Sequence, residues 1–303
     1  FPYTTLFRSN VVSFMITRRD LLTKSLSLLL ADYSLCPIKG FASSNIDLYR
    51  LQVELSNPTI EFINKPFIKF YLPMSINSRQ YLLDVHSDIK FGLNRLPSGH
   101  NILKVELDEI EPWNTIILNF MLSMRFSPPI QTDLAVSTTL KNNANHLFST
   151  ISENDRLLLS NTAQSLKAKS DIDTLKNTFD WVINNFKPSN YNAGFLTIDK
   201  LWETKSGDCS EFALLTSSLL RMNGIASRNM AGFLLRDQKV LFMQLFHNWC
   251  ECLVDEHWWI ADAYTQTLAD TVQSHLATQV YEIDDNEIHQ AKFMVSDGVK
   301  VKI

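Results

Sequence analysis

The sequence predicts an α+β protein, in which an N-terminal β-sandwich is followed by helices and then by an antiparallel sheet. Up to about residue 126, apolar residues recur at every second position, which is the period of a β-strand. Between residues 170 and 224 the period is 3.6, and from residue 229 it returns to two. Helices gathered ahead of a run of strands favour this class over an alternating α/β arrangement.

The first strands are predicted from alternating apolar residues. The clearest is 116–126, where every second residue is apolar from Ile116 to Phe126. Turn-forming residues such as Asn57-Pro58 separate the other runs, which supports short antiparallel strands. Those other runs are 48–55, 60–72, 81–85 and 102–110.

Two consecutive prolines, Pro128-Pro129, predict a boundary, because neither a strand ladder nor a helix interior tolerates them. We therefore expect a leader at 1–42, a β-sandwich at 43–128 and a catalytic part at 129–303.

The helices are predicted from their period and their end signals. One covers 172–186, with Ser170 and Asp173 as a capping pair. A second runs from about Cys209 to Asn223, where Gly224 supplies the left-handed position that ends many helices. Strands are expected to follow at 229–235, 240–254 and 258–264.

The composition excludes several classes of protein. The chain has 303 residues, with 28 Lys and Arg against 32 Asp and Glu, a net charge of −4. This balance gives no attraction to nucleic acid. After the N-terminal region no uncharged apolar run approaches the length of a membrane span. Four cysteines are too few for a disulfide scaffold.

The first 42 residues resemble a removable leader rather than part of a fold. Residues 1–9 resemble translated sequencing adapter, which makes Met15 the expected start. Thr17-Arg18-Arg19 precedes a short leucine-rich run, and Ala42 ends a small-residue cleavage site. We expect export to the periplasm by the twin-arginine or the general secretory route, with an N-terminal helix as the alternative.

Cys209 is the candidate nucleophile. It follows Gly207-Asp208 and opens a predicted helix. Unpaired backbone N–H groups and the helix dipole favour a thiolate at such a position. Asp208 is expected to cap the helix rather than to react.

His247 and Asp262 are the candidate partners of Cys209. If Asp255-Glu256 form a two-residue turn, Val254 faces His257 and Asp262 becomes the diagonal neighbour of His247. A slip of one residue would move Asp262 to the opposite face of the sheet. In the predicted register, Cys209 attacks a carbonyl, His247 acts as base and then acid, and Asp262 orients the imidazole.

The ordered motifs resemble the transglutaminase-like superfamily, whose core is similar to that of papain-type proteases. The resemblance covers residues 197–265 and implies acyl transfer through a Cys209 thioester. It spans peptidases, amidases and cross-linking transferases, acting on a protein or peptide amide, in this case one of the cell envelope. We favour hydrolysis because water is always present. The residues that carry the resemblance are Gly207-Asp208-Cys209, the run Arg221 to Arg228, Ala231-Gly232-Phe233, His247-x-Trp249-x-Glu251, and Trp258 with Asp262.

Alternatives to this interpretation remain open. Tyr191 is a candidate second oxyanion donor, beside the backbone N–H of Cys209. No cofactor is expected. Cys209, His247, Cys250 and Cys252 have the ligand types of a zinc site, but strand alternation places the last two away from His247. The chain would be a non-catalytic binding or cell-envelope scaffold if the triad were inactive.

Overall fold

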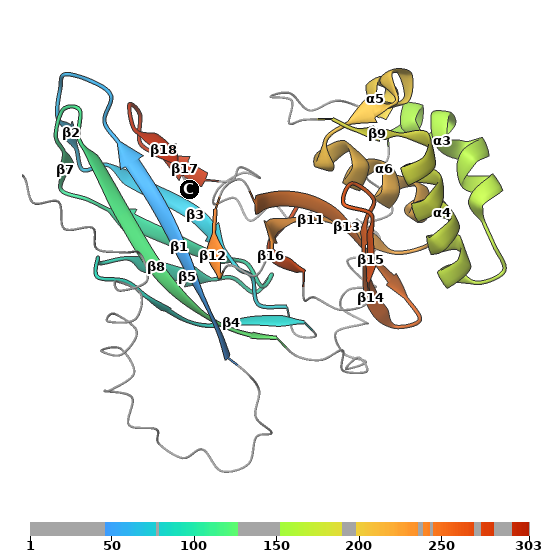
Figure 1. The fold of residues 1–303 in the computed structure, drawn as a ribbon, viewed down its shortest axis with the longest axis horizontal. Coiled ribbons are helices and arrows are strands. Elements are labelled where there is room, and N and C mark those ends of the chain that lie inside the picture. Colours follow the sequence, from blue (N-terminus) through green and yellow to red (C-terminus); the bar gives the residue numbers. More distant parts are fainter. Residues whose placement is uncertain are drawn as a thin grey trace, which may run out of the picture. The chain divides into compact units, whose positions relative to one another are not determined.

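In the computed structural model, the described residues form two sheets that share one core, a third sheet, and a group of helices that packs on the third sheet (Figure 1). All the residues described lie within Ser44–Ile303. The predicted leader, Pro128-Pro129 and Tyr191 lie outside the described residues, so what concerns them stays a prediction. The described residues are 46–76, 79–126, 152–189, 198–235, 239–242, 245–269, 274–281 and 293–302.

The first sheet is built on two long antiparallel strands, β1 (Ile46–Ser56) and β8 (Thr115–Phe126), which lie side by side in Figure 1. Strand β4 (Gln80–His86) pairs with the other edge of β8. Beyond β1, the sheet is extended by β12 (Val240–Leu241) and β18 (Lys300–Lys302).

A second sheet shares an apolar core with the first. Leu51 and Phe120 of the first sheet and Phe70 and Leu103 of the second belong to one buried cluster. The alternation seen in the sequence therefore sends one face of each strand inward. The order of the second sheet is β17 (Phe293–Val295), β3 (Phe67–Leu72), β6 (Asn101–Glu106) and β5 (Gly92–Arg95), and a two-stranded ladder joins β2 (Ile63–Asn64) to β7 (Glu109–Ile110).

Strands from the second half of the chain complete both sheets of the first half. β12 and β18 pair with β1, and β17 pairs with β3. The sheets therefore cross the predicted boundary, which assigns every residue after 128 to the catalytic part.

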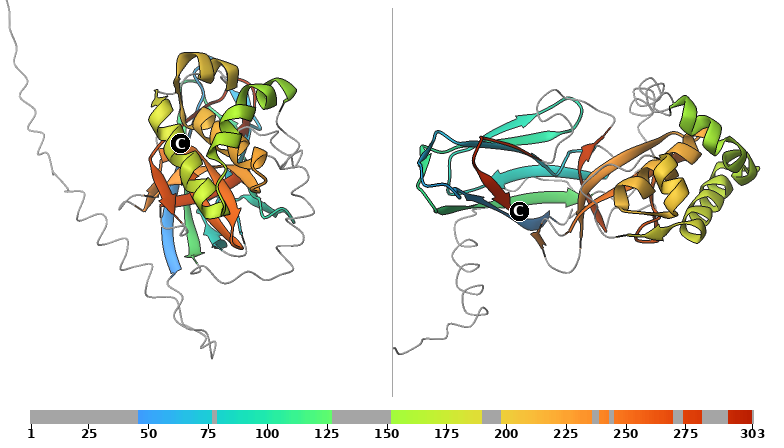
Figure 2. Two further views of the ribbon diagram at one scale, coloured as in Figure 1. Left: turned by 90° about the vertical axis from the view of Figure 1, so that its right-hand side faces the viewer. Right: turned by 90° about the horizontal axis from the view of Figure 1, so that it is seen from above.

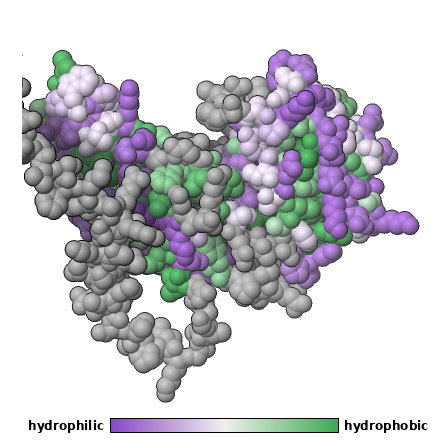
Figure 3. All heavy atoms as spheres, viewed as in Figure 1, coloured by the Kyte–Doolittle hydropathy of each residue, from purple (hydrophilic) through white to green (hydrophobic). Residues whose placement is uncertain are grey.

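Within the described ranges, four helices form one group, which Figures 1 and 2 show from three sides. Ser170 caps the predicted helix, and its Oγ accepts a hydrogen bond from the Asp173 N–H at 3.2 Å. The outer face of this group carries mostly hydrophilic residues (Figure 3), while apolar residues pack inward. The four helices are α3 (Glu153–Leu166), α4 (Asp171–Asn185), α5 (Ile198–Thr204) and α6 (Cys209–Met222). The sequence interpretation missed α3 and α5.

A third, antiparallel sheet packs against α6 and confirms the α+β class. The predicted strand 240–254 is two strands, because β12 pairs with β1 whereas β13 pairs with β11. None of the described helices has the length and apolar character needed to cross a membrane. The sheet order is β15 (Thr267–Ala269), β14 (His257–Asp262), β13 (Phe246–Val254), β11 (Ser227–Leu234) and β16 (His275–Val280), and β9 (Lys187–Pro188) pairs separately with β10 (Ser206–Gly207).

Candidate active site

Cys209 is the first residue of α6, and a capping box holds that end of the helix. Asp208 Oδ1 accepts a hydrogen bond from the Ser210 N–H at 2.8 Å, and Glu211 Oε2 accepts one from the Asp208 N–H at 2.7 Å. Asp208 is therefore the cap that the sequence predicts. Cys209 is partly exposed, so its thiol is accessible at the positive end of the helix.

The hairpin between β13 and β14 has the predicted register. Val254 pairs with His257, and Cys250 pairs with Ala261. Asp255 and Glu256 form the turn with φ of 49° and 64°, the left-handed values that a two-residue hairpin turn requires. In this register the Asp262 and His247 side chains lie on the same face of the sheet.

His247 connects Cys209 with Asp262. Its Nε2 lies 2.8 Å from Asp262 Oδ2, and it also interacts with the Cys209 side chain, which helps to raise the pKa of His247. Since Nε2 faces Asp262, Nδ1 is the nitrogen left for the sulfur. The structure thus brings the three predicted residues together in the order Cys209, His247 and Asp262.

The pKa of His247 reflects these neighbours. Burial lowers it, but the hydrogen bonds and charges of Asp262 and Cys209 raise it, and the net pKa is about 9 against an ordinary 6.5. An imidazolium is therefore stabilised between two acidic groups.

A second histidine, His275 on β16, bonds the same carboxylate oxygen. Its Nε2 lies 3.0 Å from Asp262 Oδ2, and its Nδ1 lies 2.7 Å from Ser274 Oγ. The Thr265 hydroxyl also donates to Oδ2, at 2.5 Å. The sequence interpretation missed His275, because a single histidine in a weakly predicted strand carries no motif.

The carboxylate of Asp262 is stabilised in its ionised form. Burial would raise its pKa, yet hydrogen bonds from His247, His275 and Thr265 hold the pKa well below its usual range. An ionised carboxylate only accepts hydrogen bonds, so both histidines donate from Nε2.

Among the described residues, one group of three could hold a cation. Ligand atoms of His247, Asp262 and His275 lie within 4.8 Å of one another. However, each Nε2 is at hydrogen-bond distance from Oδ2, which requires a proton between the two atoms. We therefore treat the group as hydrogen-bonded.

Cys250 and Cys252 pack away from this group. Both are fully buried in the apolar cluster that β13 shares with α6. Burial raises the pKa of the Cys252 thiol, which keeps it protonated and inert. This packing agrees with the strand alternation that opposes a zinc site at these cysteines.

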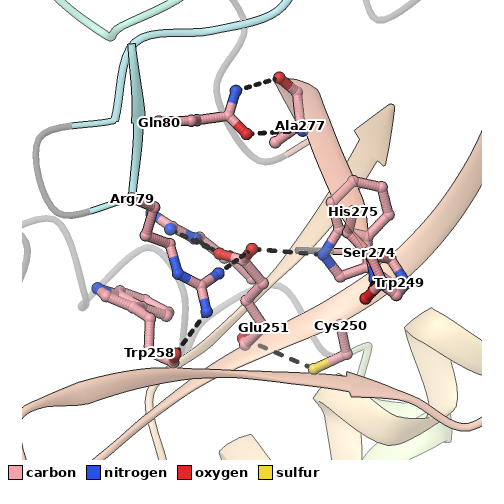
Figure 4. A network of polar contacts seen from close by, with 10 residues as sticks. Arg79, Gln80, Trp249, Cys250, Glu251, Trp258, Ser274, His275 and Ala277 are labelled. Atoms are coloured by element: carbon pink, nitrogen blue, oxygen red, sulfur yellow. Dashed lines mark hydrogen bonds and ion pairs between the residues drawn. The ribbon is translucent and has the colours of Figure 1, made fainter. Parts of the chain in front are cut away.

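Glu251, on the same face of β13 as His247, joins a buried ionic network (Figure 4). It pairs with Arg79 from the loop before β4 and with Arg228, whose Nη2 lies 2.6 Å from Glu251 Oε2. Arg79 Nη2 also donates to the Trp258 carbonyl, at 2.5 Å. Arg228 thus has a structural role, and the network ties the loop before β4 to β13 and β14.

The sequence model of the transglutaminase-like superfamily matches residues 160–263. No curated protein matches the chain. The matched segment holds Cys209, His247 and Asp262, whereas His275 lies beyond its end.

Several solved structures align with the chain. A candidate cysteine protease from Cytophaga hutchinsonii aligns over 86% of this chain and 89% of its own, at 15% identity and a TM-score of 0.56. The periplasmic domain of TgpA from Pseudomonas aeruginosa aligns over 75% of this chain and 85% of its own, at 12% identity and a TM-score of 0.37. LapG from Legionella pneumophila aligns over 44% and 80%, at 14% identity and a TM-score of 0.32. At 15% identity, the likeness to the first of these concerns the fold alone.

Proposed function

Since residues 160–263 match the sequence model of the transglutaminase-like superfamily, we propose that the protein is a cysteine enzyme of this kind that cleaves protein or peptide amides through a Cys209 thioester. One observation supports this most: His247 lies between two acidic groups, because it is hydrogen-bonded to the buried Asp262 at 2.8 Å and its pKa is raised by Cys209 as well. This is the arrangement in which an imidazole accepts a thiol proton and holds it for a leaving group.

The first half of the reaction makes an acyl-enzyme. The Cys209 thiolate attacks the amide carbonyl carbon, and the Cys209 N–H stabilises the oxyanion. The carbon–nitrogen bond then breaks as the His247 imidazolium gives its proton to the departing amine. A thioester and a free amine result.

The second half releases the acyl group. Neutral His247 takes a proton from water, the resulting hydroxide attacks the thioester, and the thiolate leaves beside the re-formed imidazolium. An amine in place of the water would give transamidation by the same steps. We favour hydrolysis, since water needs no site of its own.

Several finer points belong to the same proposal. Export by the twin-arginine or the general secretory route rests on Thr17-Arg18-Arg19 and the apolar run that follows. A substrate amide in the cell envelope would follow from export. Tyr191 remains the candidate for a second oxyanion donor. It follows Ser189 by two residues in the sequence, and the Ser189 carbonyl accepts a hydrogen bond at 3.0 Å from the hydroxyl of Tyr264, a residue near the candidate triad.

The test is the rate of iodoacetamide labelling of Cys209 as a function of pH, with Cys209→Ala as the blank for other thiols. Wild type should keep a reactive plateau at pH values well below the ~8.5 at which a free thiol titrates. His247→Ala should lose this plateau. Two identical profiles, each like that of free cysteine, would reject the enzyme and leave the scaffold interpretation.

A further inference from the structure

His275 lies beside the candidate triad, although no step of the proposed reaction uses it. It is 1% exposed, and its ring centroid is 6.2 Å from that of His247. We propose that His275 is a positioning residue that fixes Asp262 for His247, and that Gln80, from the first sheet, holds the strand that carries His275. This role rests on the proposed function, because it is defined by the triad.

The first step concerns Asp262. Its Oδ2 accepts hydrogen bonds from His247 and Thr265, both of which precede β15 in the chain, and from His275, which lies on a separate strand. Without the third donor, the carboxylate is held only from its own hairpin and the adjoining turn. His275 therefore fixes the oxygen that His247 needs from an independent part of the sheet.

The second step concerns the orientation of His275 itself. Donation from Nε2 leaves Nδ1 as an acceptor in the neutral ring, and the Ser274 hydroxyl supplies the proton at 2.7 Å. The Trp249 ring packs edge-on against His275, with the centroids 4.9 Å apart. One tautomer and one ring orientation are thereby selected.

The third step concerns β16. Gln80 is fully buried, and its side chain bonds both backbone groups of Ala277: Nε2 donates to the Ala277 carbonyl at 2.8 Å, and Oε1 accepts from the Ala277 N–H at 3.0 Å (Figure 4). The same Nε2 donates to the Met74 carbonyl at 2.8 Å. A side-chain amide thus takes the place of a neighbouring strand, two residues from His275.

The β16 ladder needs this support. Gly232 pairs with Ala277 but Ala231 pairs with Gln279, so the register shifts between them. The extra residue of this bulge, Thr278, directly follows Ala277, which is bonded by the Gln80 side chain and whose carbonyl also accepts from the Met74 N–H at 2.9 Å. The N-terminal sheets therefore take part in positioning the candidate triad.

The experiment compares His275→Gln with His275→Met. The two side chains have similar size, and the amide of glutamine can donate as Nε2 does whereas methionine cannot. The readout is the pH profile of iodoacetamide labelling at Cys209. The ionisable groups around His247 are Cys209 from α6, Asp262 at the end of β14, Tyr264 from the turn that follows, and His275 from β16. Asp208, the cap of α6, acts on Tyr264.

We expect His275→Gln to keep the wild-type profile. His275→Met should lower the reactive plateau by up to about tenfold, since a poorly held Asp262 that lowers the pKa of His247 by about one unit shifts the proton from the imidazole back to the thiol. Gln80→Met should lower the plateau by less, and Gln52→Met on β1 should leave it unchanged. If His275→Met does not fold, Ser274→Ala removes the partner of Nδ1 and should also lower the plateau.

The outcomes separate the two proposals. A wild-type profile like that of free cysteine would overturn the triad and this role together. A wild-type plateau that His275→Met and Ser274→Ala both retain would overturn the role of His275 alone. The role of His275 would also be overturned if His275→Gln behaved like His275→Met. A change of the wild-type profile on addition of EDTA would overturn it as well, because His275 and Asp262 would then bind a cation.

Discussion

Val254 and His257 face each other across the hairpin that joins β13 to β14, and their pairing determines where Asp262 lies. Each side chain along β14 alternates in direction, so a shift of one residue would turn Asp262 to the face of Cys250 and Cys252. The position of the candidate triad therefore depends on a turn some distance from it in sequence.

The turn itself offers the first prediction. Asp255 and Glu256 both have positive φ, which Asn and Gly adopt at lower cost. The double substitution Asp255→Asn with Glu256→Gly should raise the free energy of unfolding by about 1 kcal/mol. Urea denaturation measures this, with unchanged Cys209 labelling as the control. A loss of stability would contradict the turn described.

The second prediction concerns the triad. Cys209→Ala and His247→Ala should each abolish turnover of a peptide amide, and the double variant should be no worse than either, because the two residues act as one unit. Asp262→Asn should fold and retain more activity than either, because Asp262 supports the imidazole without bonding to the substrate. Steady-state kinetics decide this. Additive losses in the double variant would contradict a shared role.

The third prediction is the pH dependence of His247. Its folded pKa, about 9, exceeds the ordinary value of 6.5. Its contribution to stability is therefore fully present below about pH 6.5 and is lost as the pH rises through about 9. Over this window the free energy of unfolding of wild type should fall more than that of His247→Gln. Parallel curves for the two proteins would show that His247 is not charged in the fold.

The fourth prediction tests the buried network. Glu251 is 2% exposed and pairs with two guanidinium groups, those of Arg79 and Arg228. Glu251→Gln should cost about 3–5 kcal/mol, because both cations remain buried without their carboxylate. The matched control is Glu203→Gln, which breaks an exposed pair with Lys200 and should leave the free energy of unfolding almost unchanged. Equal costs in urea denaturation would refute the network's role.

The fifth prediction concerns Gly232. A Cβ at this position would lie 2.0 Å from the Leu276 carbonyl oxygen, so β16 would have to move away from β11. Gly232→Ala should therefore cost at least about 2 kcal/mol. Gly92→Ala is the control, since nothing lies within 4 Å of its added Cβ. Thermal unfolding compares them, and a stable Gly232→Ala protein would show that β16 packs less closely than described.

The hairpin and the helix starts could be predicted because their signals are local. Ser170 and Asp208 cap helices through residues two or three positions away, and the turn at Asp255-Glu256 sets the pairing of its own strands. Such relationships are contained in short windows of sequence. The candidate triad then follows from two local features, one helix start and one hairpin register.

Long-range pairings could not be predicted in the same way. Val240 and Leu241 have the same alternation as the strand after them, yet they pair with β1, almost two hundred residues earlier. His275 on β16 reaches Asp262 at the end of β14 although β11 and β13 lie between these two strands in the sheet. Periodicity indicates that a segment is a strand, but not which edge it joins.

The late strands have a consequence for the protein during its synthesis. β17 and β18 are the last of the described strands to leave the ribosome, and they cover edges of β3 and β1. Until they emerge, both sheets of the first half present unpaired N–H and C=O groups, which invite pairing with other chains. The nascent protein therefore passes through an aggregation-prone intermediate whose strand edges are paired in the final fold. A chaperone that covers strand edges would act on this intermediate.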